Sequence, residues 1–132
     1  MIDNTHFDIL NVIETHGTYQ PEKPAVCCGE ITRSWQDLKQ NINKAANFFK
    51  EIGVSKGDNV ALLIGNRPEI IELIFGIVKT GACVVPLSGL LTKEQVTVLV
   101  NNSNAKLFVV DNEFINLVTS DMTQLKNIDK DK

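Results

Sequence analysis

Apolar residues in the middle of this chain form short continuous runs, separated by segments in which they recur at helical spacing. The run at 59–64 is rich in Val, Leu and Ile, and similar runs follow at 82–85 and 107–110. The intervening segments, 68–79 and 92–102, have the apolar spacing of helices. Because buried strands joined by helices pair in parallel through right-handed crossovers, the pattern predicts a parallel α/β sheet.

Turn and cap residues mark the junctions between these segments. Residues 65–68 read Gly-Asn-Arg-Pro, and Pro near the first helical position is a helix-start signal. Gly81 is expected to end this helix, because glycine readily adopts the left-handed conformation of a C-terminal cap. Thr92 and Gln95 have the spacing of a capping box for the next helix. Residues 113–118 are expected to begin a further helix.

An amphipathic helix is expected near the start of the chain, over 3–16, where apolar residues recur at helical spacing. Asp3 or Asn4 would cap this helix, since both side chains accept hydrogen bonds from a helix N-terminus. Gly17 would end it.

A hairpin and a second helix are expected to follow. Short strands at 25–28 and 31–33 flank a Gly-Glu turn. Ser34 and Asp37 have the spacing of an N-cap with its capping-box acid, and Gly53 would end the helix that they begin.

Together these elements predict a three-layer α/β fold, with a mainly parallel sheet, flanking helices and a small N-terminal β-hairpin. At 132 residues, of which 43% are hydrophobic and 22% charged, the chain has the composition of a globular domain. We expect residues 1–132 to form a single subdomain, with a poorly ordered tail from about residue 119.

Charge and hydropathy limit the possible partners and location. The net charge of -3 argues against nucleic acid, because phosphate neutralisation needs a basic surplus on one face. The N-terminus lacks the basic region of a signal peptide. The most apolar stretch, 70–78, contains Glu72 and is too short to span a bilayer. We therefore expect a cytoplasmic protein without a transmembrane segment.

The three cysteines, Cys27, Cys28 and Cys83, do not have the spacing of a disulfide framework or a zinc site. All three lie in expected strands, where a free cysteine acts as a small hydrophobic residue. We expect them in the core.

The carboxyl ends of the expected strands are the expected place for chemistry, because ligands of open parallel sheets bind there. These ends are 65–68, 87–92 and 111–113. They contain no glycine-rich nucleotide loop and no nucleophile elbow, and the chain has no HExxH zinc motif. The residues alone therefore indicate an α/β domain without a complete active site.

Several single residues have a structural interpretation that is preferred over a functional one. His6 and His16 are ten positions apart on one helix, which is too far for a shared metal. Asp58 lies at the start of a strand, the wrong end for a ligand, and is expected to fix a turn. Trp35, at helical spacing with Leu38, is expected in the core.

At the carboxyl ends themselves, Asn66 and Thr92 are expected to act in turns or caps rather than in ligand binding. Ser88 is a second hydroxyl in the same loop as Thr92. Arg67 is the single positive charge at a helix N-terminus on this edge, and a solvated surface arginine is preferred over an anion-binding one.

Four segments carry a resemblance to a known family. Residues 31–38 read ITRSWQDL, preceded by Pro-Ala at 24–25, and residues 53–61 read GVSKGDNVA. Residues 66–69 read NRPE, and residues 78–87 read VKTGACVVPL. In this order and spacing, they resemble the N-terminal part of the adenylate-forming enzymes, the acyl-CoA synthetase and AMP-binding superfamily.

The resemblance extends over about residues 20–112, with mild departures. Ser34-Trp35 stands where the family commonly has Thr-Tyr, and Ser88 stands where Asn or Asp is common. The resemblance implies the N-terminal subdomain of a longer ligase. Such an enzyme activates a carboxylic acid with Mg-ATP as an acyl-adenylate and passes the acyl group to CoA. The wording of the matched segments favours acyl-CoA synthetases of fatty or medium-chain acids over amino-acid-activating domains, with aryl acids and amino acids as the alternatives.

The residues that perform this chemistry in the family lie downstream of the matched segments. They comprise a phosphate loop, an aromatic-Thr-Glu segment, a ribose-binding Asp and a Lys on a mobile lid, and none is present here. The resemblance therefore implies no catalytic, cofactor-binding or metal-binding residue in this chain. ATP, Mg and CoA are implied for the parent enzyme only, and the chain alone is expected to be inactive.

The expected partners are the remainder of the parent enzyme and, for that parent, the carboxylic acid. The nearly all-round apolar helix at 68–79 predicts exposed apolar surface and self-association in isolation. One alternative is a free-standing binding or assembly module without catalysis. Another is an unrelated flavodoxin-like domain that binds a nucleotide at 65–68.

Overall fold

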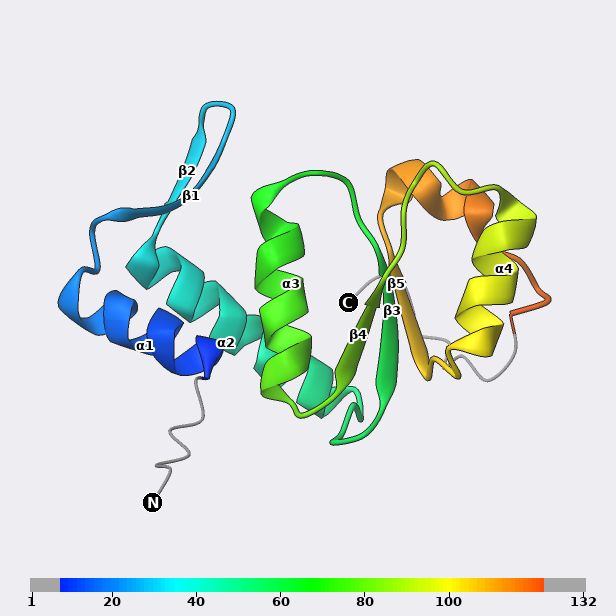
Figure 1. The fold of residues 1–132 in the computed structure, drawn as a ribbon, viewed down its shortest axis with the longest axis horizontal. Coiled ribbons are helices and arrows are strands. Elements are labelled where there is room, and N and C mark those ends of the chain that lie inside the picture. The colour runs from blue at the N-terminus through cyan, green and yellow to red at the C-terminus, as the bar shows by residue number, and fades with distance from the viewer. Residues whose placement is uncertain (1–7, 123–132) are drawn as a thin grey trace, which may run out of the picture.

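The computed structural model describes residues 8–122, and within them a three-stranded parallel sheet is flanked by helices on both faces (Figure 1). The elements in chain order are α1 (Ile9–Tyr19), β1 (Pro24–Cys28), β2 (Ile31–Ser34), α2 (Trp35–Glu51), β3 (Asn59–Leu63), α3 (Pro68–Lys79), β4 (Cys83–Pro86), α4 (Lys93–Asn102), β5 (Leu107–Val110) and the 3-10 helix η1 (Asn112–Leu117). This arrangement confirms the predicted fold class.

The sheet has the order β4-β3-β5, with both outer strands parallel to β3. Val60 of β3 is opposite Val84 of β4 and Leu107 of β5. Four consecutive β3 residues, Val60 to Leu63, are buried, because helices cover both faces of the central strand. Figure 1 shows α2 and α3 on one side of the sheet, and α4 with η1 on the other.

Three apolar clusters hold these layers together. One lies between the sheet and the helices α2 and α3, and is formed by Phe49, Val54, Val60, Ile77, Ala82 and Leu107. The second lies on the opposite face and is formed by Ala61, Val96, Val100, Ala105 and Met122. The third joins α1 to α2 and is formed by Ile13, Leu38 and Ile42, with Trp35 packed against it as predicted.

The first helix differs from its prediction at both ends. It begins at Ile9, with the Asp8 side chain accepting a hydrogen bond from the backbone N–H of Leu10 at 2.9 Å. Asp3 and Asn4 lie outside the described residues. The prediction that Gly17 ends the helix is wrong. Gly17 is buried inside α1, where a Cβ would lie 2.7 Å from Cδ of Lys39, so its small size allows α1 to approach α2.

The predicted caps of the other helices are confirmed. Ser34 and Thr92 both form capping boxes, with Asp37 and Gln95 as their partners. Gly81 has a positive φ of 87° after α3, as expected for a residue in the left-handed region. The segment expected to begin a helix at 113–118 forms the 3-10 helix η1 one residue earlier.

The cysteines lie in strands as predicted, but the expectation that they belong to the core is wrong. Cys27 and Cys83 are exposed, and Cys28 is half-buried. Cys27 and Cys28 lie in a two-stranded hairpin that has no second sheet against its outer side, and Cys83 begins an edge strand. A pattern of small apolar residues identifies a strand, but it does not say which strand lies at the centre.

The apolar helix α3 packs against α2 and the sheet, and its large apolar side chains are buried or half-buried. Exposed large apolar residues instead lie on other elements, among them Leu90, Val98 and Leu99 around α4. None of the helices within residues 8–122 is both long and apolar enough to cross a membrane.

Candidate functional site

The strand order identifies one place in the sheet where a ligand would be expected. The chain passes from β3 to its neighbour β4, then crosses back to place β5 on the other side of β3. In doubly wound α/β sheets, ligands bind at the carboxyl ends of the strands where this reversal occurs. That point lies between Gly65, in the loop after β3, and Asp111, directly after β5. We call these ends and the loops that follow them the carboxyl edge.

An ion pair closes the carboxyl edge between these two strands. Arg67 precedes α3, and one of its guanidinium nitrogens lies 2.8 Å from a carboxylate oxygen of Asp111. The other oxygen of Asp111 accepts a hydrogen bond from the backbone N–H of Asn112 at 3.0 Å and so caps η1. Arg67 is about half exposed, and its charge is compensated by Asp111, so it is an ion-paired residue and not the freely solvated arginine preferred from sequence.

Side chains of η1 occupy the rest of this edge. A Cβ on Gly65 would collide with the carboxylate of Glu113, and a Cβ on Gly89 would collide with the ring of Phe114. A carboxylate beside the backbone after β3 repels phosphate instead of attracting it. The residues at this edge therefore do not fit a triphosphate, and no nucleotide-dependent step can be assigned to them.

The remaining predicted residues of this edge act in local structure. Asn66 lies in the turn, but it does not cap α3, because Arg67 occupies the N-cap position. The carbonyl oxygen of Asn66 accepts a hydrogen bond from the Cys28 thiol at 3.5 Å, which ties the hairpin to this turn. The hydroxyl of Ser88 accepts from the backbone N–H of Leu90 at 3.2 Å.

A second group of charges lies at the opposite, amino edge of the sheet. Lys106 donates hydrogen bonds to a carboxylate oxygen of Asp58 at 2.9 Å and to the carbonyl of Gly53 at 3.1 Å. The same Asp58 oxygen accepts from the backbone N–H and the hydroxyl of Ser55. Lys106 first, and then Ser55, hold the pKa of Asp58 below its ordinary value. This arrangement confirms that Asp58 fixes a turn.

A third group joins the hairpin to α2 and α3, and sequence reasoning missed it. Glu72, on the apolar helix α3, is buried, and its Oε1 accepts a hydrogen bond from the Asn41 side chain at 2.9 Å. The Nε of Arg33 lies 3.4 Å from the same oxygen, and an Arg33 Nη lies 3.6 Å from Glu69. The available signal was an acid at position 72 within the otherwise apolar stretch 70–78, because a buried carboxylate needs a partner.

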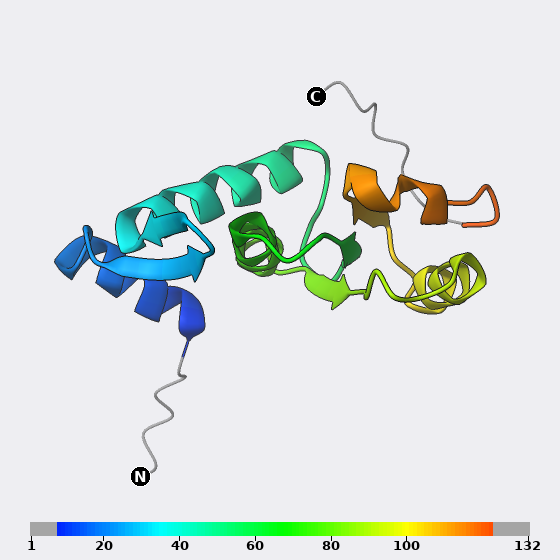
Figure 2. The same cartoon turned by 90° about the horizontal axis from the view of Figure 1, so that it is seen from above.

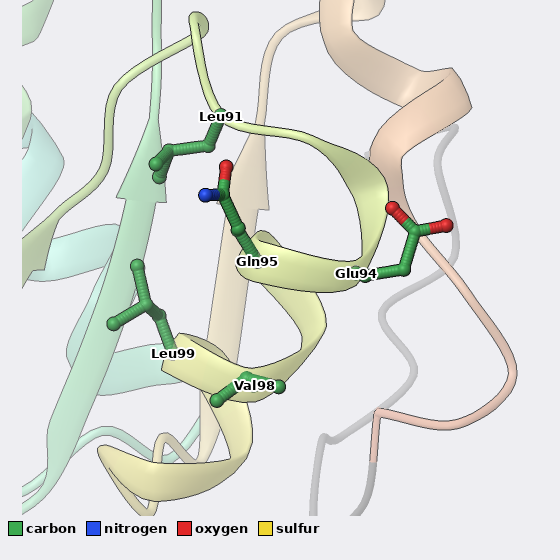
Figure 3. Close-up of a pocket in the computed structure, with 5 residues that line it drawn as sticks. All are labelled: Leu91, Glu94, Gln95, Val98 and Leu99. Atoms are coloured by element: carbon green, nitrogen blue, oxygen red, sulfur yellow. The ribbon is translucent and has the colours of Figure 1, made fainter.

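A shallow hollow of about 390 Å³ lies along α4 and the loop before it, lined by Leu91, Glu94, Gln95, Val98 and Leu99 (Figure 3). Its lining is mostly apolar, and the Gln95 carboxamide is already used in the capping box with Thr92. Figure 3 shows the Glu94 side chain pointing away from Leu91 and Leu99. The hollow contains no pair of groups suited to acid–base or nucleophilic chemistry.

Metal chemistry has no support in the part of the chain that the structure describes. No group of three His, Cys, Asp or Glu side chains is placed there to hold a metal ion. His16 packs against Trp35, with the ring centroids 4.7 Å apart and the rings tilted by 32°, and His6 lies outside the described residues.

Comparisons with known sequences identify relatives of this chain. Residues 13–132 match the family model described as AMP-binding enzyme. The crotonobetaine/carnitine–CoA ligase of Escherichia coli O127:H6 is 39% identical over 115 aligned residues, covering 80% of this chain and 22% of that protein. The protein of the same name from Salmonella arizonae is 42% identical over 89 residues, covering 67% of this chain and 17% of that relative. The chain thus spans less than a quarter of these relatives.

Comparisons with solved structures agree with the sequence relatives. The anthranilate CoA ligase AuaEII, solved in complex with anthranoyl-AMP, has a TM-score of 0.82 at 25% identity, covering 88% of this chain and 23% of that chain. A Mycobacterium tuberculosis fatty acyl CoA synthetase has a TM-score of 0.82 at 22% identity, covering 89% and 25%, and supports the fold alone. Because the family model covers most of its length, this chain belongs to the AMP-binding enzyme family.

Proposed function

We propose that this chain is the N-terminal portion of an ATP-dependent acid–thiol ligase, which activates a carboxylic acid as an acyl-adenylate and transfers the acyl group to CoA. The observation that carries the proposal is 39% identity to a CoA ligase over an alignment that covers 80% of this chain. A free-standing binding module is less well supported, because the matched relatives bear the names of CoA ligases.

The chain by itself is proposed to be inactive. The carboxyl edge is closed by the Arg67–Asp111 ion pair and by Glu113, so it offers no cradle for phosphate groups. ATP, Mg and CoA would be held by other parts of the ligase. We expect the purified chain to give no ATP–pyrophosphate exchange above a protein-free blank, and exchange above that level would overturn the proposal.

The ligase role is tested by exchanging segments. In the E. coli relative, the aligned N-terminal segment is replaced by this chain, and release of pyrophosphate that depends on acid and CoA is measured. Retained activity supports the role of this chain as the N-terminal portion of such an enzyme. A chimera that folds but forms no CoA thioester contradicts it.

Two classes of acid substrate are proposed for the ligase. The family resemblance of the sequence favours a fatty acid, while the names of the curated relatives favour crotonobetaine or carnitine. The test is a panel of these acids given to the complete ligase polypeptide that contains these residues. The acid with the highest kcat/KM identifies the substrate, and a preference for an aryl acid would contradict both candidates.

A further inference from the structure

We propose that η1 is a reversible strap over the carboxyl edge, locked by the Arg67–Asp111 ion pair and opening when that pair separates. The inference goes beyond the proposed function, because it concerns two conformations of this chain itself. Figure 2 shows this end of the molecule from above, with η1 in orange beside the end of β5. The proposal is carried by the way η1 contacts the loops that follow β3 and β4.

The strap rests on two glycines, one in each of these loops. The Glu113 carboxylate lies against Gly65, and the Phe114 ring lies against Gly89, so that a Cβ on either glycine would collide with η1. Neither glycine has a positive φ, so the backbone conformation does not require glycine at these positions. The missing side chains instead allow η1 to lie directly on both loops.

The strap is a weakly held segment between two firm anchors. None of its residues is buried, and the Arg67–Asp111 pair that locks it includes an arginine that is about half exposed. Before η1, the backbone N–H of Asp111 binds the carbonyl of Leu63 at 2.9 Å. After η1, Val118 packs against the apolar cluster that contains Met122. A segment with few buried contacts opens locally at a low cost in free energy, while its anchors stay in place.

Opening of the strap changes the charge at the carboxyl edge. In the closed state, the carboxylates of Asp111 and Glu113 both lie beside Gly65, and Arg67 is paired. The Asp111 side chain caps η1, and Glu113 belongs to it. A swing of η1 therefore carries both carboxylates away from Gly65 and leaves the Arg67 guanidinium free. Because ligands of such sheets bind at this edge, the strap determines the sign of the charge that they meet.

Nuclear magnetic resonance of the full chain at low concentration tests whether the strap opens. The Phe114 ring shifts the Hα resonances of Gly89 in the closed state, and Phe114→Ala gives their position without the ring. Raising the NaCl concentration from about 0.01 M to about 1 M screens a partly exposed ion pair. We expect the Gly89 resonances to move towards the Phe114→Ala position, or a second set to grow there if exchange is slow. Gly89 resonances that do not respond to salt overturn the proposal.

Arg67→Met removes the lock of the strap. It is expected to move Gly89 towards the open position already at low salt and to abolish the salt dependence. Lys39→Met is the matched control, because it removes a pair of similar length, 2.9 Å to Glu14, between α1 and α2. It should leave Gly89 unchanged. Gly65 must respond together with Gly89, since η1 covers both, and a response of Gly89 alone overturns the proposal by showing that only the ring moves.

Gly89→Ala tests the strap from the other side. Its methyl group takes the place of the Phe114 ring, so η1 is expected to be held open, with Gly65 at its position in Arg67→Met. Adding Phe114→Ala makes room for the methyl group and should return Gly65 to its wild-type position. An unchanged Gly65 in Gly89→Ala, or an equal displacement in the double variant, overturns the proposal.

The resonances of β3 distinguish opening of the strap from loosening of the sheet. Val60 and Leu62 are expected to keep their positions during the salt titration, because they lie in the buried central strand. Salt-dependent changes at these residues that accompany those of Gly89 overturn the proposal. If Gly89→Ala does not fold, the salt dependence of the wild-type chain and of Arg67→Met decides the question.

Discussion

Among single residues, Glu72 shows how a charge can be placed inside an apolar region. It is the one charged residue that is buried within residues 8–122, and it lies on α3 between apolar neighbours. Arg33 from the hairpin and Asn41 from α2 both reach its Oε1. A buried carboxylate is tolerated only when such partners replace its hydration. Through these polar contacts, Glu72 links α3 to the hairpin and to α2.

Arg33→Met tests this interpretation. Removing one partner of a buried pair leaves an uncompensated charge, and partial exposure of Arg33 reduces the loss, so we expect the free energy of unfolding to fall by about 2 kcal/mol. Urea denaturation measures the change. Lys39→Met is the control, because its pair with Glu14 is shorter, at 2.9 Å, but more exposed, and should contribute less than about 1 kcal/mol. Equal losses in the two variants would contradict the interpretation.

Asp58 should make the stability of the chain depend on pH. Its hydrogen bonds from Lys106 and Ser55 keep the pKa lower in the folded state than in the unfolded state. The stability from this shift is therefore present at neutral pH and is lost as the pH falls below about 4. Asp58→Asn should lower the urea midpoint at pH 7 and have a smaller effect at pH 3.5. Glu51→Gln, at an exposed position, is the control, and a pH-independent effect of Asp58→Asn would contradict the prediction.

Among the elements, α2 and α3 are in close contact at Gly76. A Cβ on Gly76 of α3 would lie 2.6 Å from the Cβ of Ala45 and 3.2 Å from the backbone N of Ala46 on α2. Small residues at a crossing allow two helix backbones to approach closely. The apolar pattern predicted both helices and their bounds, but it did not predict that they would cross at this glycine.

Gly76→Ala tests the closeness of this crossing. Alanine is favoured over glycine in a helix by about 1 kcal/mol, whereas overpacking costs about 1–3 kcal/mol. Because two of the three nearest atoms belong to the backbone of α2, we expect overpacking to prevail and thermal stability to fall. Adding Ala45→Gly removes the colliding methyl group and should recover part of the loss. A stabilised Gly76→Ala variant would show that the helices are not in contact there.

At the scale of the whole molecule, three of the eight exposed large apolar residues within residues 8–122 lie on α4 and its preceding loop. Leu90 is 96% exposed, Val98 55% and Leu99 41%, and the last two line the hollow in Figure 3. The sequence led us to expect such surface on α3, which the fold instead packs against α2 and the sheet. Apolar residues gathered on one exposed face commonly mark a contact with another protein surface.

We expect the isolated chain to self-associate through this face of α4. Light scattering at increasing concentration should give a mean mass above that of the monomer. Val98→Glu should bring the mass back to the monomer value, since it places a charge at the centre of the face. Ile31→Glu, on the exposed hairpin 46% accessible to solvent, is the control and should have no such effect. A monomeric wild-type chain at high concentration would contradict this prediction.

The sequence by itself determined the local structure. The continuous apolar runs at 59–64 and 107–110 predicted buried strands, and the capping boxes at Ser34 and Thr92 began helices where expected. These features depend on residues close together in the chain, so propensity and periodicity report them. The family resemblance depends on the same short segments, and the matched family model confirms it.

Only the tertiary structure decided which of these elements would be central, which edge would be closed and where buried charge would be paired. The positions of the exposed cysteines, the Arg67–Asp111 pair at the carboxyl edge and the burial of Glu72 all depend on residues brought together from distant parts of the chain. Packing between elements selects such contacts, and no local pattern encodes them. For the same reason, the position of Pro86 on an outer strand became visible only once the strand order was known.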